Sequence, residues 1–131
     1  MDTLAHRVDP KVASGPALKA FSKLAERWKL DVDEQLILLG LTARSTFFKW
    51  KKDKEPHLPM DTLERISYLL GIFKALHILL PTDDAADGWV KRKNDAPLFG
   101  GKTALERMLS GRVADLYEVR RYLDSQRGGW A

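Results

Sequence analysis

Residues 33–52 read DEQLILLGLTARSTFFKWKK, and this stretch has the pattern of two short helices joined by a turn. Apolar residues recur at helical spacing before Gly40, and a basic segment follows it. Asp31 or Asp33 can cap the first helix, and Gly40 can end it. Two short helices around a Gly-containing turn, with the second helix basic, predict a helix-turn-helix that binds DNA.

The second helix of this pair, expected from Thr42 or Ala43 to about Lys52, has two different faces on a helical wheel of about 100° per residue. Ala43, Phe47 and Trp50 fall on one side, which predicts a packed face. The opposite side is polar and basic, as a helix that reads a DNA groove requires. The candidate DNA-binding residues on or beside that side are Arg44, Ser45, Thr46, Phe48, Lys49, Lys51 and Lys52.

Arg44 and Ser45 come early in this helix, where side chains reach base edges in such motifs. An arginine can form two hydrogen bonds with a guanine edge, whereas the lysines would mostly contact phosphates. Phe48 leaves two interpretations open: partial packing against the first helix, or contact with a thymine methyl group or another subunit. For the whole element, the alternative is a helical hairpin with solvated lysines, because basic helix ends also suit the helix dipole.

On the N-terminal side, residues 1–15 are expected to form a flexible lead-in. Pro16 suits the first turn of a helix, and apolar residues recur at helical spacing from there to about Trp28. On the C-terminal side, the stretch KEPHLP at 54–59 contains two prolines and is expected to be a linker. We therefore expect a helical DNA-binding module over residues 16–58.

A long helix is expected from Asp61, as its cap, to Leu80, where Pro81 would stop it. Its apolar residues cover more than one face, and a helix that is apolar nearly all round must be covered on most sides. In a chain of 131 residues a second subunit can supply part of that cover, so we expect a homodimer. The residues that argue against a membrane span here are Glu64, Arg65, Lys74 and His77.

Residues 89–109, WVKRKNDAPLFGGKTALERML, predict a presented loop followed by a helix. The pair Gly100-Gly101 permits backbone angles that are closed to other residues. Thr103 can cap the helix, and Glu106 three residues later completes a capping box. The helices expected in this half of the chain lie at about 84–91, 103–109 and 113–125. The expected fold is all-α, with a helical dimerisation and partner-binding module over residues 59–131.

Both stretches resemble known modules. The segment LLGLTARSTFFKWKK at 38–52 resembles the Xre-type helix-turn-helix, and residues 89–109 resemble the C-terminal toxin-binding domain of the Xre/MbcA/ParS-like antitoxins. That domain contains, in this order, a Trp, an Asn-x-x-Leu-like stretch, a Gly-Gly-basic-Thr turn and a helix. The sequence departs from the family at Ala104, where Pro is frequent, and at Leu36, where many such motifs have Ala.

The resemblance implies an antitoxin of a bacterial type II toxin–antitoxin pair. The implied partners are operator DNA, through which it represses its own operon, and a RES-domain toxin, a class that consumes NAD. The antitoxin would block the active site of the toxin within a higher-order complex. The residues that this resemblance and the C-terminal sequence assign to toxin binding are Asn94, Leu98, Phe99, Gly100, Gly101, Lys102, Arg121, Tyr122, Arg127, Gly128, Gly129, Trp130 and Ala131.

The C-terminal sequence QRGGWA places Trp130 next to the last residue, after Gly128-Gly129. Chain ends normally carry small polar residues, so this tryptophan has two interpretations. It can fold back onto the last helix, or it can anchor a partner, since Trp is enriched at binding hot spots. The resemblance favours the second interpretation, because family antitoxins direct their C-terminal end toward the active-site cleft of the toxin.

Composition and charge exclude several classes of site. The chain has no Cys, and its three histidines lie far apart, so we expect neither a metal site nor a cofactor. No nucleophile has a base beside it, which argues against an enzyme, and the acidic group Asp83, Asp84 and Asp87 is better explained as cap and first-turn charges. The net charge of +4 favours nucleic acid as a partner. The first fifteen residues lack the apolar core of a signal peptide, so a cytoplasmic location is expected.

Two other functions stay open from the sequence. The first is a stand-alone dimeric helix-turn-helix repressor without a toxin partner, whose C-terminal half only dimerises. The second is a scaffold or polar-localisation adaptor that binds protein only. An adjacent RES-type reading frame would favour the antitoxin over both.

Overall fold

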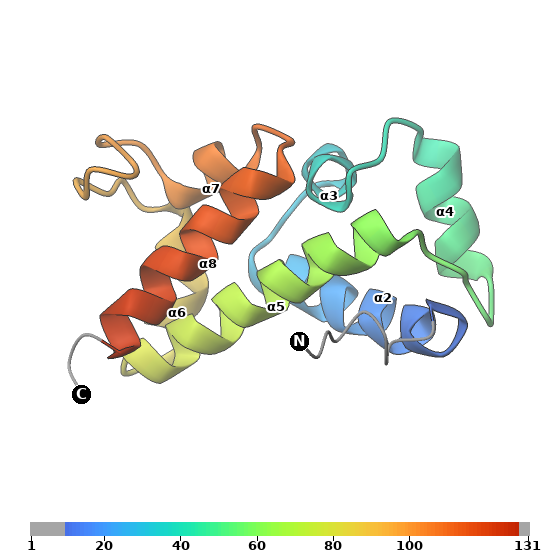
Figure 1. Cartoon of the computed structure of the whole chain (residues 1–131), viewed down its shortest axis with the longest axis horizontal. Helices are drawn as coiled ribbons and strands as arrows, with labels where there is room; N and C mark the ends of the chain where they lie inside the picture. The colour runs from blue at the N-terminus through green and yellow to red at the C-terminus, as the bar shows by residue number, and fades with distance from the viewer. Residues whose placement is uncertain (1–9, 129–131) are drawn as a thin grey trace, which may run out of the picture.

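The computed structural model describes residues 10–128, and in this range the regular structure is helical (Figure 1). An isolated antiparallel bridge joins Lys93 to Thr103, and the described residues form no β-strand. The prediction of an all-α fold is confirmed. The helices are α2 (Pro10–Arg27), α3 (Val32–Leu39), α4 (Arg44–Lys52), α5 (Met60–Leu79), α6 (Asp83–Gly88), the short 3-10 helix η1 (Trp89–Lys91), α7 (Ala104–Met108) and α8 (Val113–Gly128).

Helix α5 lies at the centre of the molecule and contacts helices from both halves of the chain (Figure 1). Helices α2 and α3 pack against it from the N-terminal side, and α6 and α8 pack against it from the C-terminal side. Its most deeply buried residues, each at most 1% exposed, are Ile66, Leu69, Ile72, Ala75 and Leu76. The chain itself therefore covers this face of α5, and the homodimer that the sequence suggested stays a prediction.

Two helix starts differ from the expectation. Helix α2 begins at Pro10, so residues 10–15 are helical rather than part of a lead-in, and Pro16 lies inside the helix. A tertiary contact holds this early part of the helix in place, because the backbone N–H of Leu58 donates to the buried Ser14 hydroxyl at 2.8 Å. Helix α5 begins one residue before Asp61, with Pro59 at the N-cap position, so Asp61 is not its cap.

The turns around the helix-turn-helix agree with the local sequence. Asp31 caps α3 and forms a capping box with Glu34. Gly40 ends α3 in the left-handed conformation, with φ of 77°. The Asp31 cap and Gly40 define the two ends of α3, and α4 begins four residues after Gly40.

A buried arginine on α5 joins the two halves of the chain. The Arg65 side chain, 11% exposed, donates from Nε to Asp61 at 3.0 Å and from Nη1 to the backbone carbonyl of Gly111 at 2.9 Å. It also lies against Gly40, since a Cβ atom placed there would come within 2.6 Å of Arg65 Nε. The turn of the helix-turn-helix, α5 and the α7–α8 turn therefore meet at one side chain.

A second charged cluster connects α2 with α6. Arg27 Nε donates to Asp87 at 2.7 Å, and the two ring nitrogens of His77 lie 2.8 Å from Asp87 and 3.2 Å from Asp83. Thr82 caps α6, and Asp83 lies in its first turn as expected. Asp87 is not a first-turn charge, which corrects that expectation: it lies near the end of α6 and pairs across to α2 and α5.

Candidate functional site

The basic helix α4 exposes one face and buries the other. Phe47 and Trp50 are 1% and 9% exposed, as the helical wheel predicted for a packed face. Ala43 was expected on that face but is exposed, because it is the N-cap residue that precedes the helix. Thr46 is half-buried, and the exposed candidates are Arg44, Ser45, Phe48, Lys49, Lys51 and Lys52.

At the start of α4, Arg44 forms an ion pair with Asp33 of α3, with Nη1 and Oδ1 2.7 Å apart. Both side chains are mostly exposed, at 57% and 75%, so the pair is worth about 0–1 kcal/mol. A phosphate or a base edge can therefore replace Asp33 as the partner of the guanidinium. Phe48 is 42% exposed and makes an edge contact with the Phe47 ring at 5.4 Å, so part of its ring stays available to another molecule.

The loop between η1 and α7 is closed by its own backbone. The Asn94 N–H donates to the Lys102 carbonyl at 2.9 Å, and the Gly101 N–H donates to the Asn94 carbonyl at 2.8 Å. The Asn94 side chain accepts from the Ala96 N–H at 2.9 Å, so it shapes the loop. Gly100 and Gly101 have φ of 58° and 86°, which explains the glycine pair.

A capping box and an aromatic cluster fix this loop to the body. Thr103 caps α7 and forms the predicted box with Glu106. The Phe99 ring packs edge-on against Trp89 and Tyr122, with centroids 5.7 and 5.4 Å apart. Phe99, which was assigned to toxin binding, is 5% exposed and so lies beneath the surface of the loop. It connects the loop to the C-terminal half of α8.

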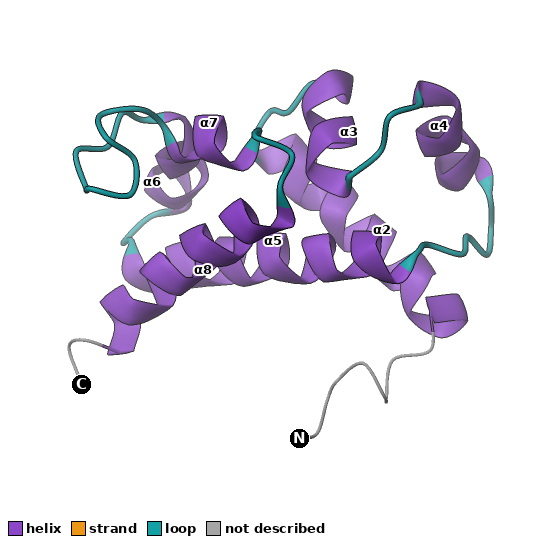
Figure 2. Cartoon of the chain, turned by 45° about the horizontal axis from the view of Figure 1, so that its top comes forward, coloured by secondary structure: helices purple, strands orange, loops and turns teal. Residues whose placement is uncertain are grey.

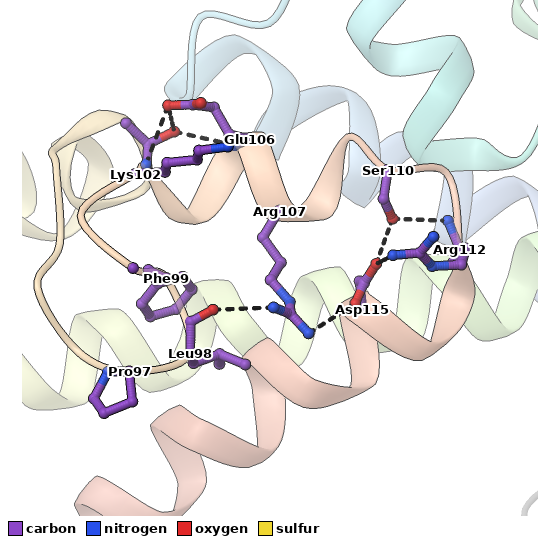
Figure 3. A pocket seen from close by; sticks show the side chains of 11 residues that line it. Pro97, Leu98, Phe99, Lys102, Glu106, Arg107, Ser110, Arg112 and Asp115 are labelled. Atoms are coloured by element: carbon purple, nitrogen blue, oxygen red, sulfur yellow. Dashed lines mark hydrogen bonds and ion pairs between the residues drawn. The ribbon is translucent and has the colours of Figure 1, made fainter.

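A pocket of about 440 Å³ lies between the loop, α7 and the start of α8 (Figure 3). Arg107 spans it by donating to the Leu98 carbonyl at 3.0 Å and pairing with Asp115 at 3.2 Å. Arg112 pairs with the same carboxylate at 3.0 Å, and the Ser110 hydroxyl donates to it. The Ser110 hydrogen bond and the two guanidinium groups hold the pKa of Asp115 below its usual range, against the effect of its burial.

Arg107 and Asp115 are therefore structural supports of the loop that sequence reasoning did not find. Asp115 lies in the first turn of α8, where an acidic residue is expected for the helix dipole alone. No local signal pairs it with Arg107, because the two residues meet only when α7 folds against α8. The other loop candidates differ in exposure: Gly100 and Lys102 are exposed, and Leu98 and Gly101 are half-buried.

The remaining candidates lie along the C-terminal half of α8 or beyond it. Arg121 is 71% exposed, and Arg127 is 39% exposed beside Asp124. Tyr122 is half-buried against Phe99, and Gly128 is the last residue of α8. Gly129, Trp130 and Ala131 lie outside the described residues.

Within residues 10–128, no group of three or more histidine, cysteine, aspartate or glutamate side chains is arranged to hold a metal ion. None of the helices in the described part of the chain is long and apolar enough to cross a membrane.

Comparisons with known proteins cover both halves of the chain. The family model described as "Antitoxin Xre-like helix-turn-helix domain" matches residues 7–71, and the one described as "Antitoxin Xre/MbcA/ParS C-terminal toxin-binding domain" matches residues 75–129. A protein of Sinorhizobium fredii (strain NBRC 101917 / NGR234), described as "Uncharacterized protein y4oB", is 54% identical over 112 residues, or 86% of this chain and 84% of that protein. No solved structure matches the chain.

The two matched domains follow each other in the order that the sequence predicted, and both are regulatory binding domains rather than enzymes. The first contains the helix-turn-helix of α3 and α4, and the second contains the closed loop, its pocket and α8. The chain belongs to the Xre/MbcA/ParS antitoxin family, as an antitoxin in which an Xre-like DNA-binding domain precedes a toxin-binding domain.

Proposed function

We propose that this antitoxin neutralises a RES-domain, NAD-consuming toxin by blocking its active site, and that it represses its own operon. The observation that carries the proposal is the position of two exposed surfaces on one molecule. Helix α4 lies at one end of the long axis and the closed loop of residues 93–103 lies at the other, with α5 between them (Figure 1, Figure 2). One chain can therefore hold DNA and toxin at the same time.

The DNA part of the proposal rests on α4. Its basic side is exposed, its apolar side is anchored by Phe47 and Trp50, and Arg44 at its start is 57% exposed in a replaceable ion pair. Helix-turn-helix proteins commonly read two half-sites about 34 Å apart, so we propose that two chains bind one operator. We also propose that α5 lies at or next to the interface between the two chains; its most exposed apolar side chains are Ile78 at 52% and Met60 at 45%.

The toxin part rests on the closed loop and the end of α8. The loop presents Gly100 and Lys102, and Asn94 holds the shape in which they are presented. Arg121 and Arg127 are exposed along α8, where they pair with Glu118 at 4.0 Å and with Asp124 at 3.8 Å. In this proposal the residues after α8 enter the cleft of the toxin, and Trp130 is the aromatic anchor.

Deletion of residues 128–131 tests the inhibitory role of the C-terminal end. The deletion should leave folding and DNA binding intact, while loss of an aromatic hot spot should cost about 2–4 kcal/mol of toxin binding. The truncated chain is co-expressed with the protein encoded by the neighbouring gene, and growth and cellular NAD are measured together. A Trp130→Ala variant serves as the matched control for the loss of backbone. Full rescue by both variants at equal abundance would show that this segment is not the inhibitory element.

The alternative is a stand-alone dimeric repressor. It predicts that the protein encoded by the neighbouring gene does not copurify with the chain, and that deleting residues 128–131 changes neither growth nor cellular NAD. The toxin-binding domain match over residues 75–129 is the observation that favours the antitoxin.

A further inference from the structure

A second pocket, of about 210 Å³, lies between α2 and the C-terminal end of α4. Its lining combines an apolar base with polar side chains and comes from both helices and the segment after α4. The lining residues are Gly15, Leu18, Lys19, Ser22, Trp50, Lys51, Asp53, Lys54 and Pro56. Helix α2 contributed nothing to the predicted DNA-binding set, so this pocket brings new residues next to α4.

The pocket is positively charged. Three lysines, Lys19, Lys51 and Lys54, face one aspartate, and none of these lysines has an ion-pair partner among the described residues. The carboxylate of Asp53 is already engaged, because it accepts a hydrogen bond from the Glu55 N–H at 3.0 Å. Ser22 adds a hydroxyl group that can donate to an anion.

Buried contacts hold the walls of this pocket in place. Leu18 and Trp50, at 6% and 9% exposed, belong to the hydrophobic core. The segment after α4 is tied to α2 by the hydrogen bond from the Leu58 N–H to Ser14, and Leu58 itself is fully buried. The Lys51 ammonium lies 5.0 Å from the centroid of the Phe47 ring, which restricts its position. The lysines therefore extend from a fixed base.

We propose that this pocket binds a phosphate of the DNA backbone beside the groove that α4 enters. This inference rests on the proposed DNA-binding function and adds α2 to the interface. Arg44 and Lys51 are seven residues apart on one helix, which separates them by about 10 Å at about 1.5 Å per residue. The major groove is about 12 Å wide, so a helix whose start reaches the bases places its other end near the flanking phosphates.

The test measures how binding to duplex DNA from upstream of the coding region depends on salt. Each neutralised phosphate contributes a slope of about −0.9 in a plot of log affinity against log salt. Lys19→Gln should make the slope shallower by about that amount. The ratio of native to variant affinity for DNA should therefore fall about 3-fold between about 50 and 200 mM salt. Lys74→Gln is the matched control, because Lys74 is an exposed lysine on α5 that does not line the pocket.

Gly15 offers a second variant that leaves the lysines in place. It lies inside α2, and no atom of residues 10–128 comes within 4 Å of the position of a Cβ atom there, so a longer side chain has open space among these residues. Gly15→Glu should weaken DNA binding because it adds negative charge at the pocket. Gly15→Gln adds a side chain of the same shape without the charge, so it should retain more of the DNA affinity. Circular dichroism checks that both variants keep the helical content of the native protein.

The outcomes separate the two ideas. A native protein without salt-dependent DNA binding overturns both the pocket and the proposed DNA-binding function. The phosphate site alone is overturned if the native protein binds DNA, Lys19→Gln leaves the slope unchanged, and Gly15→Glu and Gly15→Gln bind with equal affinity. A shallower slope in Lys19→Gln and a normal slope in Lys74→Gln support the phosphate site.

Discussion

Replacing Gly40 by alanine should destabilise the protein mainly through Arg65. Gly40 has φ of 77°, and an alanine in the left-handed conformation costs about 1–2 kcal/mol. The added Cβ would lie 2.6 Å from Arg65 Nε, so the guanidinium must move. A solvated arginine would move at little cost, but Arg65 is 11% exposed and donates to the Gly111 carbonyl at 2.9 Å.

The magnitude follows from the contacts that this movement breaks. A hydrogen bond from a charged group contributes about 1.5–3 kcal/mol, and the pair with the half-exposed Asp61 adds little. Gly40→Ala should therefore lower the free energy of unfolding by about 2.5–5 kcal/mol. In an Arg65→Ala background the conflict with the guanidinium is gone. The Asp61 carboxylate, 3.0 Å from the Cβ position, is 56% exposed and can move away, so the same substitution should cost mainly the backbone penalty of about 1–2 kcal/mol.

A double-mutant cycle measures the difference between the two backgrounds. Unfolding of the four proteins in urea is followed by far-ultraviolet circular dichroism, and the free energies are extrapolated to water. Gly15→Ala is the matched control, because its Cβ has open space and alanine favours a helix by up to about 1 kcal/mol over glycine. Equal costs of Gly40→Ala in both backgrounds would refute the role of Arg65 in this turn.

Three other outcomes are expected. Arg44→Ala should weaken the free energy of operator binding by about 1–3 kcal/mol and relax sequence specificity, while Lys52→Ala should weaken binding to all sequences. Unchanged gel shifts with both variants would show that α4 is not part of the DNA interface. Asp115→Asn should lower stability at neutral pH by about 2 kcal/mol. Because the folded-state pKa of Asp115 is lowered, its stabilisation is present above the unfolded-state pKa of about 3.9 and is lost as pH falls through the folded-state value. The unfolding curves of native and variant protein should therefore converge only in acid, and a constant difference would contradict the pKa shift. Light scattering of the protein–operator complex should give two chains for each operator, and a complex with one chain would refute the dimer.

The features that could be predicted from the sequence are those that neighbouring residues determine. The Thr103–Glu106 capping box, the Asp31 cap and the glycine end of α3 each depend on residues within one or two helical turns. The two faces of α4 follow from helical periodicity, so the burial of Phe47 could be read from spacing. Local chemistry was therefore sufficient for these helix ends and for the burial of Phe47 and Trp50 on α4.

The features that could not be predicted depend on contacts between distant residues. Pro16 suggested a helix start, but the hydrogen bond between Ser14 and Leu58 supports an earlier one, across 44 residues of sequence. Phe99 was assigned to toxin binding, and it is buried, with Trp89 and with Tyr122 of α8 packed against it. A pattern along the chain contains no information on which distant aromatic ring will cover a given side chain.

The shared helix α5 has a consequence for how such antitoxins can diverge. The family matches divide the chain between residues 71 and 75, yet that division falls inside α5, which runs from Met60 to Leu79. A recombination event at the division would join an Arg65 from one parent to a Gly111 from another, and the α7–α8 turn would have to fit a foreign arginine. The preferences for DNA and for toxin should therefore be inherited together. Exchanging one domain would require compensating substitutions in the other, where the two pack against α5.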